Sequence, residues 1–263
     1  MRWFAYGVLL SSLAWPLHAH AAGGCRVESG MQRVPLVELY TAEGCSDCPP
    51  ADKWLSGLAV EQAPDGAIPL AMHVDYWDAE GWPDRFADAA YTKRQDFRLH
   101  LARKKVRYTP QVMIGEQTGV DWRDPRKIRH TLSKAREAVA PVALTLEAVP
   151  ADGKLQVRVG ATPAAETSAG KPDLLWLAMY QDDLTSEIAE GENKGRTLHH
   201  DRVARALHGP WGLSGAPVNG TVDLPLPAGK ADLQGLGLVL FAESSATGDG
   251  LQALELVLDT CRN

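Results

Sequence analysis

The spacing of hydrophobic residues between positions 33 and 140 alternates between that of strands and that of helices. β-forming residues in succession indicate strands, and apolar residues recurring every three or four positions indicate helices. The pattern predicts strands over residues 34–42, 68–77, 109–115 and 119–123, and helices over residues 50–60, 83–104 and 124–140. The expected order is therefore β-α-β-α-β-β-α.

Pro141 ends the last of these helices, and beyond it the hydrophobic pattern changes to the two-residue period of strands. Residues 142–150 and 154–160 flank a turn and predict a hairpin. We expect roughly six to eight strands up to Thr260, which is typical of a small antiparallel sandwich. The chain is accordingly divided into residues 33–140 and a β-rich domain over residues 141–263.

The N-terminus has the pattern of a secretory signal peptide. Arg2 precedes an apolar run over residues 3–17, and Ala19-His20-Ala21 offers a cleavage site. The alternatives are an uncleaved anchor and a lipid on Cys25, although the leucine expected before a lipidated cysteine is missing. We predict a signal peptide over residues 1–21, no membrane span after cleavage, and a periplasmic or secreted protein.

Composition and charge narrow the class of partner. The chain of 263 residues is 45% hydrophobic and 23% charged, which is typical of a globular protein. Its net charge of −6 argues against nucleic acid or an anionic membrane surface as a partner. The basic stretch over residues 98–107 is interpreted as a solvated helix face. The oligomeric state does not follow from the sequence.

Four cysteines remain after the predicted cleavage: Cys25, Cys45, Cys48 and Cys261. Disulfides persist in an oxidising compartment, and four cysteines allow three connectivities. Spacing favours one of them, because Cys45 and Cys48 are local partners and the other two lie at the ends of the mature chain. We therefore predict a structural disulfide between Cys25 and Cys261.

The Cys45-x-x-Cys48 pair directly precedes a predicted helix. A helix N-terminus lowers the pKa of a thiol and so favours the reactive thiolate. We expect Cys45 to be the more exposed sulfur and the nucleophile, and Cys48 to be the resolving partner. Asp47 opposes this effect, because a carboxylate disfavours a nearby thiolate. The alternatives are an inert disulfide and a metal site, but zinc normally has four ligands and no second pair completes a site.

The dithiol and the dipeptide Thr109-Pro110 occur in an order that resembles the thioredoxin fold. In that fold a dithiol at a helix N-terminus faces a cis-proline loop. The resemblance covers residues 33–140 and implies an α/β thioredoxin-like N-terminal domain before the β-rich domain. We predict a cis bond at Thr109-Pro110, because only X–Pro bonds take that form at modest cost. Thr109 and Pro110 are expected to shape the substrate groove beside Cys45.

Four longer motifs resemble a narrower family of exported bacterial proteins. They are VELYTAEGCSDCPPAD, HVDYWDAEGWPDRFADAAYTKRQ, YTPQVMIG and GENKGRTLHHDRV. That family is thioredoxin-like in its N-terminal half and is catalogued only as a domain of unknown function. The resemblance implies the fold and the export, but no activity, substrate or catalytic residue.

His73 and Asp75 alternate on the second predicted strand and should point to one face. They lie at the strand end that the dithiol loop also occupies, where a buried acid or imidazole could carry the proton of Cys48. The alternative is a plain hydrogen bond or a salt bridge to Arg85 or Arg94. Three aromatic residues follow: Tyr76, Trp77 and Trp82. They could line a groove beside the dithiol, and the alternative is that they pack in the core.

The stretch GENKGRTLHHDRV crowds polar residues together, and its two glycines, Gly191 and Gly195, allow tight turns. We interpret it as a polar loop that docks the two domains, with Arg196 as its anchor, because a guanidinium holds a carboxylate with two parallel bonds. A metal or ligand site is the alternative. His199 and His200 weaken it, because adjacent residues on a strand face opposite ways.

The sequence leaves two classes of function open. The first is a thiol–disulfide oxidoreductase that acts on protein or small-molecule thiols and disulfides without a cofactor or metal. The second is a non-catalytic binding module in which the Cys45–Cys48 disulfide is structural. An exposed Cys45 with measurable turnover favours the first class, and a buried, unreactive sulfur favours the second. A minor third option is metal handling by the dithiol and His73.

Overall fold

A computed structural model describes six stretches of the chain: residues 25–62, 66–151, 153–164, 172–213, 215–228 and 232–261. The predicted signal peptide and its cleavage site lie outside the described residues. Within these stretches, no helix combines the length and apolar character that a membrane crossing requires.

The elements of the first half follow the predicted order. They are β1 (Cys25–Glu28), β2 (Leu36–Thr41), α1 (Pro49–Gln62), β3 (Ile68–His73), the 3-10 helix η1 (Asp75–Glu80), α2 (Ala89–Leu101), β4 (Gln111–Ile114), β5 (Gln117–Thr118) and α3 (Pro125–Arg136). The order β-α-β-α-β-β-α is confirmed from β2 to α3. The strand β1 and the helix η1 were not predicted.

Local capping explains where the helices begin. The side chain of Asp88 accepts a hydrogen bond from Ala90 N, so α2 starts later than the hydrophobic period suggested. The side chain of Asp124 caps α3, and Pro125 occupies its first turn, as predicted. The helix α2 ends at Leu101, and most of the basic stretch then continues as exposed chain without regular structure rather than as a helix face.

The second half consists of strands. They are β6 (Val142–Ala151), β7 (Lys154–Pro163), β8 (Leu174–Gln181), β9 (Leu184–Glu187), β10 (Thr197–His200), β11 (Val203–Gly212), β12 (Val218–Pro225), β13 (Leu236–Glu243) and β14 (Gly250–Val257), followed by the 3-10 helix η2 (Leu258–Thr260). The predicted hairpin of β6 and β7 is confirmed, with its register running from Val142 opposite Pro163 to Ala151 opposite Lys154.

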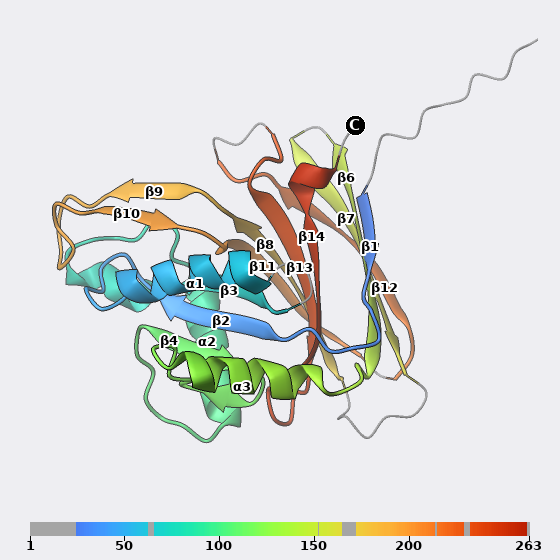
Figure 1. Cartoon of the computed structure of the whole chain (residues 1–263). Helices are drawn as coiled ribbons and strands as arrows, with labels where there is room; N and C mark the ends of the chain where they lie inside the picture. The colour runs from blue at the N-terminus through green and yellow to red at the C-terminus, as the bar shows by residue number, and fades with distance from the viewer. Residues whose placement is uncertain are drawn as a thin grey trace, which may run out of the picture.

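These strands form three sheets. Four strands pair in the order β1-β6-β7-β12, and β10 pairs only with β9. Eight strands pair in the order β14-β13-β8-β11-β3-β2-β4-β5. Figure 1 shows the four-stranded sheet on the right against β8, β13 and β14, while the hairpin of β9 and β10 extends to the left above α1.

The eight-stranded sheet shows that the predicted fold class is wrong. The expectation was an α/β thioredoxin-like domain followed by a separate β domain. Instead β3 pairs in parallel with β11, where Ala71 lies opposite Val203 and Ala71 N donates to Arg202 O. Strands from both halves thus share one mixed sheet in a mostly β structure. The periodicity of a strand shows which face is buried but not which strand lies beside it.

The eight-stranded sheet is buried on both faces. Along β8, every second side chain (Leu175, Leu177, Met179) packs against the four-stranded sheet. The side chains between them, Trp176, Ala178 and Tyr180, lie on the other face in a hydrophobic cluster with residues of α2. The opposite face of β2, β3 and β4 packs against α1 and α3. The helix α2 therefore lies against strands of both halves of the chain.

A buried ion-pair network joins α2 to this sheet. Arg94 Nε donates to Glu38 Oε1 on β2 at 2.5 Å, and Arg94 Nη2 donates to Glu243 Oε2 on β13 at 3.0 Å. Arg98 also pairs with Glu38. Burial disfavours the ionised form of Glu38, but the charges of Arg94 and Arg98 outweigh it and lower the pKa of that carboxyl. Arg94 therefore links strands that are far apart in sequence.

The two ends of the described chain are joined covalently. Cys25 and Cys261 form a disulfide with their Cα atoms 5.2 Å apart, as the even cysteine count predicted. Both cysteines pack against the core between the two large sheets. The bond ties β1 to the segment that follows β14.

We predict that Arg94→Ala will lower the free energy of unfolding by about 3–5 kcal/mol, because it removes the ion-pair partner of buried Glu243 and leaves buried Glu38 with Arg98 alone. Urea denaturation will measure this loss. Arg107→Ala is the matched control, because Arg107 pairs with Asp96 at the surface. Its effect should stay below about 1 kcal/mol. Equal effects of the two substitutions would contradict the role given to the network.

We also predict that replacing both terminal cysteines by alanine will lower the free energy of unfolding by about 2–5 kcal/mol, because the crosslink restricts the unfolded chain. The measurement is thermal and urea unfolding of the double variant beside the parent protein. Mass spectrometry of the unreduced, purified protein should find the Cys25–Cys261 peptide pair. A lipid on Cys25 would rule this pairing out.

Candidate functional site

The dithiol lies in the loop that connects β2 to α1, here called the dithiol loop (residues 42–48). Cys45 and Cys48 form a disulfide with their Cα atoms 5.4 Å apart. The helix α1 starts at Pro49, and the carbonyl of Cys48 accepts hydrogen bonds from the N–H groups of Ala51 and Asp52. The pair is therefore held at the N-terminal end of a helix, as the sequence indicated.

Both cysteines are buried, so the prediction of an exposed Cys45 is wrong. Cys45 is 1% exposed and Cys48 is 0% exposed. Both belong to the same hydrophobic cluster as Tyr40 and Met72. Local sequence does not show that a segment more than a hundred residues away contacts the backbone around Cys45.

That segment is the turn between β9 and β10, here called the covering loop (residues 191–195). The amide of Asn193, which is fully buried, donates to Glu43 O at 2.8 Å and to Cys45 O at 2.9 Å. Glu192 Oε2 accepts a hydrogen bond from Ser46 N at 3.0 Å. Two neighbouring side chains of the covering loop thus hold three backbone groups of the dithiol loop.

Arg196 supports the covering loop indirectly. Its guanidinium donates to Asn193 Oδ1 at 2.9 Å, which orients the amide toward the dithiol loop. The predicted docking role of this polar stretch is therefore found, but Asn193 makes the contact that was expected of Arg196. Gly191 and Gly195 have φ angles of 73° and 80°, a conformation that suits glycine at the ends of this tight turn.

Thr109 and Pro110 lie at the same end of the sheet as the dithiol. The Thr109-Pro110 peptide bond is cis, which confirms the prediction of its geometry. Tyr40 on β2 lies opposite Gln111 on the antiparallel strand β4. Pro110, one residue before Gln111, therefore lies next to the end of β2, where the dithiol loop begins. Trp77 Nε1 donates to Thr109 Oγ1 at 2.7 Å, and the Cβ of Trp77 lies close to Gly44. Trp77 therefore lies between the two motifs.

Five buried ionisable side chains form a second feature, here called the buried cluster: Glu43, Asp52, His73, Asp84 and His200. His73 Nδ1 lies 2.6 Å from Asp84 Oδ2. His200 lies 3.4 Å from Glu43 and 3.8 Å from Asp52, measured between nitrogen and oxygen. The two imidazole rings meet edge to face with centroids 5.0 Å apart. The cluster includes residues on both sides of the dithiol in the sequence. Glu43 lies two positions before Cys45, and Asp52 lies four positions after Cys48.

The pKa values within the buried cluster diverge. Burial disfavours the charged form of His73, but the charge of Asp84 and its hydrogen bond outweigh burial and raise the pKa of the imidazole. Burial is likewise overcome at Asp84, whose pKa is lowered mainly by His73. At Asp52 burial prevails over the histidines and raises the pKa of the carboxyl. The cluster therefore combines an ion pair with an acid that holds its proton more tightly than usual.

Asp75 does not join the buried cluster. Its carboxylate accepts a hydrogen bond from Thr92 Oγ1 at 2.6 Å, at the start of η1. Of the aromatic residues singled out, Trp77 binds Thr109 and Trp82 Nε1 donates to Glu43 Oε2 at 2.7 Å. Trp82 thus contacts the buried cluster, and His73 is the member of the predicted proton relay that lies within it.

None of Glu43, Asp52 and Asp84 was singled out in the sequence, and Asn193 was included only as one residue of the polar stretch. Asp52 carried a usable signal, because it lies three residues before Leu55 on the apolar face of α1. A carboxylate on such a face is rarely buried without a partner. Asn193 carried none, since an asparagine between glycines is typical of an ordinary turn.

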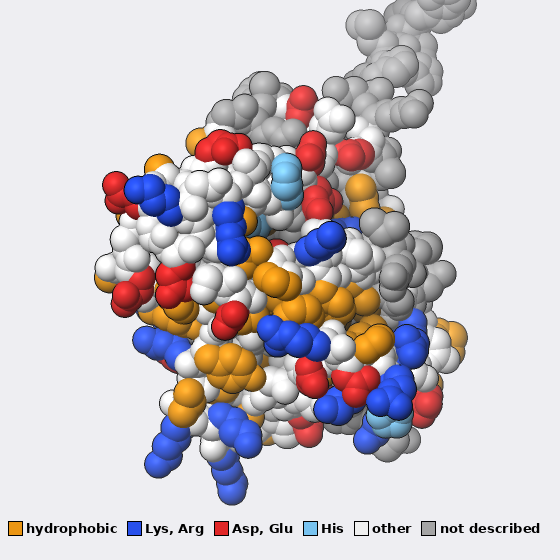
Figure 2. Space-filling model, turned by 60° about the vertical axis from the view of Figure 1, so that its left-hand side comes forward, with side chains coloured by type: hydrophobic (Ala, Val, Ile, Leu, Met, Phe, Trp, Pro, Cys, Tyr) orange, Lys and Arg blue, Asp and Glu red, His pale blue; other side chains and the backbone are white. Residues whose placement is uncertain are grey.

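Apolar surface lies beside the site. Val106 and Tyr108, just before Thr109, are 71% and 45% exposed. Figure 2 shows hydrophobic side chains in a band across the face that comes forward from the left of Figure 1, with Lys and Arg side chains projecting below it. Within the six described stretches, no group of three or more His, Cys, Asp or Glu side chains is arranged to hold a metal ion.

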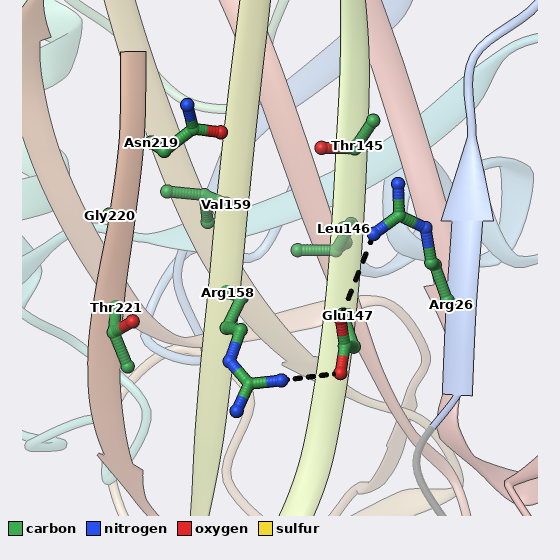
Figure 3. A pocket seen from close by; sticks show the side chains of 9 residues that line it. All are labelled: Arg26, Thr145, Leu146, Glu147, Arg158, Val159, Asn219, Gly220 and Thr221. Atoms are coloured by element: carbon green, nitrogen blue, oxygen red, sulfur yellow. Dashed lines mark hydrogen bonds and ion pairs between the residues drawn. The ribbon is translucent and has the colours of Figure 1, made fainter.

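A shallow groove of about 370 Å³ lies elsewhere, on the four-stranded sheet. Figure 3 shows Arg26 and Arg158 reaching Glu147 from the two neighbouring strands, with Asn219 and Thr221 on β12. Its charges pair with one another, and its residues do not overlap with the dithiol loop or the buried cluster. The groove therefore adds nothing to the dithiol site.

Two solved structures share the fold. One is protein AGR_C_4864 from Agrobacterium tumefaciens, with a TM-score of 0.63 and 24% identity, covering 89% of this chain and 99% of that one. The other is HBP35 of Porphyromonas gingivalis, with a TM-score of 0.65 and 14% identity, covering 89% of this chain and 77% of that one. At such identities the likeness concerns the fold alone.

A comparison with curated proteins gives no significant match. The family comparison is more informative, because it covers the dithiol loop, the buried cluster and the covering loop. Residues 36–243 match the family described as "Protein of unknown function (DUF1223)", and the chain therefore belongs to that family.

Proposed function

We propose that this protein is an exported thiol–disulfide oxidoreductase whose Cys45–Cys48 pair exchanges disulfides with protein or small-molecule thiols. The observation that carries the proposal is the position of this pair at the start of α1, beside the buried cluster. In the reduced form Cys45 is the nucleophile, and Cys48 resolves the mixed disulfide. The predicted signal peptide and the disulfides support a periplasmic or secreted location.

Stability alone is a weak reason for this disulfide. It joins residues three positions apart, and on the loop-entropy model such a small ring contributes about 2 kcal/mol, against about 5 kcal/mol for the Cys25–Cys261 crosslink. The start of α1 favours a thiolate through the helix macrodipole, whose positive end lies at the N-terminus. The arrangement therefore fits a redox-active disulfide better than a purely structural one.

The buried cluster supports proton transfer at the dithiol. Reducing a disulfide adds two electrons and two protons, so a buried pair needs a proton donor nearby. We assign that role to Asp52, because its buried carboxyl has a raised pKa and it follows Cys48 by four positions on α1. His73 Nε2 has no hydrogen-bond partner among the described residues and can pass a proton within the cluster. Buried ionisable groups with opposed pKa shifts are typical of functional sites.

Thr109 and Pro110 form the wall of the proposed substrate groove. Trp77 fixes the Thr109 hydroxyl, and the exposed side chains of Val106 and Tyr108 continue the wall outward. Apolar surface of this kind suits a protein segment in the act of exchange.

A second function is favoured by the burial of both sulfurs. A disulfide that is 1% exposed or less, and that a hairpin covers, fits a non-catalytic binding module with a structural bond. The two functions differ in one respect. A redox-active disulfide must be reduced by thiols while the protein stays folded. A structural disulfide must resist reduction under the same conditions.

We predict that Cys48→Ala will trap mixed disulfides on Cys45, because the resolving thiol is gone. The measurement is a non-reducing gel of exported protein after rapid alkylation, with the trapped partners identified by mass spectrometry.

The matched control is Cys45→Ala, which should trap no partner. If Cys48→Ala also captures nothing, and native wild-type protein resists millimolar dithiol, the disulfide is structural and the binding module is the correct function.

We predict that His73→Gln will destabilise the protein more at pH 5.5 than at high pH. The pKa of His73 is raised in the folded protein, so its stabilising charge is fully present below the unfolded pKa of about 6.5 and is lost as pH rises through the folded pKa. We expect a loss of about 3 kcal/mol or more at pH 5.5, where Asp84 loses a charged buried partner. Urea denaturation across the pH range measures it.

The control is His130→Gln, because His130 is exposed on α3. His130→Gln should change the free energy of unfolding only slightly, and the change should be the same at every pH. A loss for His73→Gln that stays constant or grows as pH rises would show that the imidazole is neutral in the folded protein.

A further inference from the structure

Six consecutive exposed residues connect the end of α2 to the Thr109-Pro110 dipeptide, here called the basic loop (residues 103–108). Two of them, Val106 and Tyr108, are among the few large apolar residues that are exposed in the described part of the chain. The other four are cations: Arg103, Lys104, Lys105 and Arg107. Exposed apolar side chains with a polar rim are typical of interaction sites.

The backbone of the basic loop is held in place near both ends. Lys104 N donates to Leu99 O in the last turn of α2 at 2.8 Å. Tyr108 O accepts a hydrogen bond of 3.0 Å from the side-chain amide of Gln95, which is fully buried. Gly119 leaves room for the Tyr108 hydroxyl, because a Cβ at Gly119 would lie 2.7 Å from that oxygen. The exposed side chains therefore project from an ordered backbone, and binding a partner costs less conformational entropy.

Most of the positive charge of the basic loop is not neutralised within the protein. Only Arg107 has a carboxylate partner, Asp96, at 2.8 Å. Arg103, Lys104 and Lys105 make no ion pair with any residue that the structure describes. The whole chain has a net charge of −6, so an acidic partner is repelled by most of its surface and attracted at the basic loop.

The basic loop leads directly into the proposed exchange site. Tyr108 precedes the cis Thr109-Pro110 bond, and Pro110 lies next to the end of β2, where the dithiol loop begins. Trp77, which donates to Thr109 Oγ1 at 2.7 Å, also lies close to Gly44 of the dithiol loop. A molecule bound along the basic loop is therefore held beside the wall of the proposed groove.

An acidic protein segment fits this surface better than an anionic membrane does. A membrane is flat and would meet much of one face of a molecule whose net charge is negative, whereas a protein segment can follow the basic loop alone. Carboxylates of that segment would meet the cations on both sides of Val106, and an apolar side chain between them would meet Val106 itself.

We infer that the basic loop is a docking surface for acidic segments of protein partners, and that these partners are the substrates of the Cys45–Cys48 pair. The second part rests on the proposed redox function and adds the substrate class to it. A loop of six residues offers a small contact area, which suits a partner that leaves after exchange.

Docking is measured without redox chemistry on the full-length mature protein. The acidic probe is a short labelled peptide with glutamates around one leucine and a serine in place of cysteine, and the reference peptide has glutamine for each glutamate. Fluorescence anisotropy gives both affinities. At about 20 mM salt the acidic peptide should bind about 10-fold more tightly, and at about 0.5 M salt the difference should fall to about two-fold or less.

Lys104→Gln combined with Lys105→Gln should weaken binding of the acidic peptide by about 3- to 10-fold at low salt. The matched control combines Arg129→Gln with Lys134→Gln, which removes two exposed positive charges from α3 and so changes the net charge equally. It should stay within about two-fold of wild type. Val106→Ser should weaken binding of both peptides by about 3-fold at low and high salt alike, because it removes an apolar contact.

Three results would overturn the docking surface. The first is equal affinity of the wild-type protein for the two peptides at low salt. The second is an equal loss in the basic-loop variant and in the α3 control, which would show a general effect of net charge. The third is binding to vesicles of phosphatidylcholine and phosphatidylglycerol without binding to either peptide, which would make the basic loop a membrane-binding segment.

The same two peptides with cysteine in place of serine test the link to the dithiol. On oxidised protein below saturation, the acidic peptide should open the Cys45–Cys48 bond about 10-fold faster per thiolate at low salt, as followed by alkylation and mass spectrometry. Equal rates despite tighter binding would overturn the assignment of the docked partner as substrate. Failure of the proposed function looks different: the acidic peptide binds as expected, but neither peptide opens the bond in folded protein. That result would confirm the docking surface and rule out the exchange.

Discussion

The pairing of β3 with β11 is the constraint on which the site depends. β10 runs into β11 through only two residues, so the register of Ala71 with Val203 fixes where the preceding hairpin can lie. That hairpin brings His200 to His73 and Asn193 to the carbonyl of Cys45. Without this parallel pair the dithiol loop would be an open connection at the end of a sheet. With it, the second half of the chain completes a site that the first half begins.

Buried charge has a different use in the two places where it occurs. Around Arg94 every charge has a close partner, and the network holds α2 across strands from both halves of the sheet. Around His200 the distances are longer, at 3.4 Å and 3.8 Å, and the carboxyl of Asp52 keeps a raised pKa. Removing charges from water is costly unless pairing is close. The looser cluster therefore costs stability, and its position beside the dithiol gives that cost a chemical purpose.

Local pattern was sufficient for the order of elements from β2 to α3, but it missed β1 and η1 and did not show which strands pair. The order of helices and strands, the hairpin of β6 and β7 and the Asp124 cap all follow from spacing and side-chain type. The mixed sheet does not, because β3 and β11 are separated by more than a hundred residues and their sequences record only burial. The same limit applies to the site. Asp52 could have been found on its apolar helix face, whereas Asn193 is identified only by what it touches.

Burial and reactivity are compatible at this dithiol if the cover is part of the specificity. A permanently open pair in an oxidising compartment would react with any thiol, whereas a covered pair reacts only with a molecule that can replace the cover. The contacts of Asn193 and Glu192 are hydrogen bonds to backbone, and their net strength is modest because water can substitute for them when the covering loop moves. The proposed exchange therefore requires both sulfurs, which are buried, to become accessible while the eight-stranded sheet stays folded.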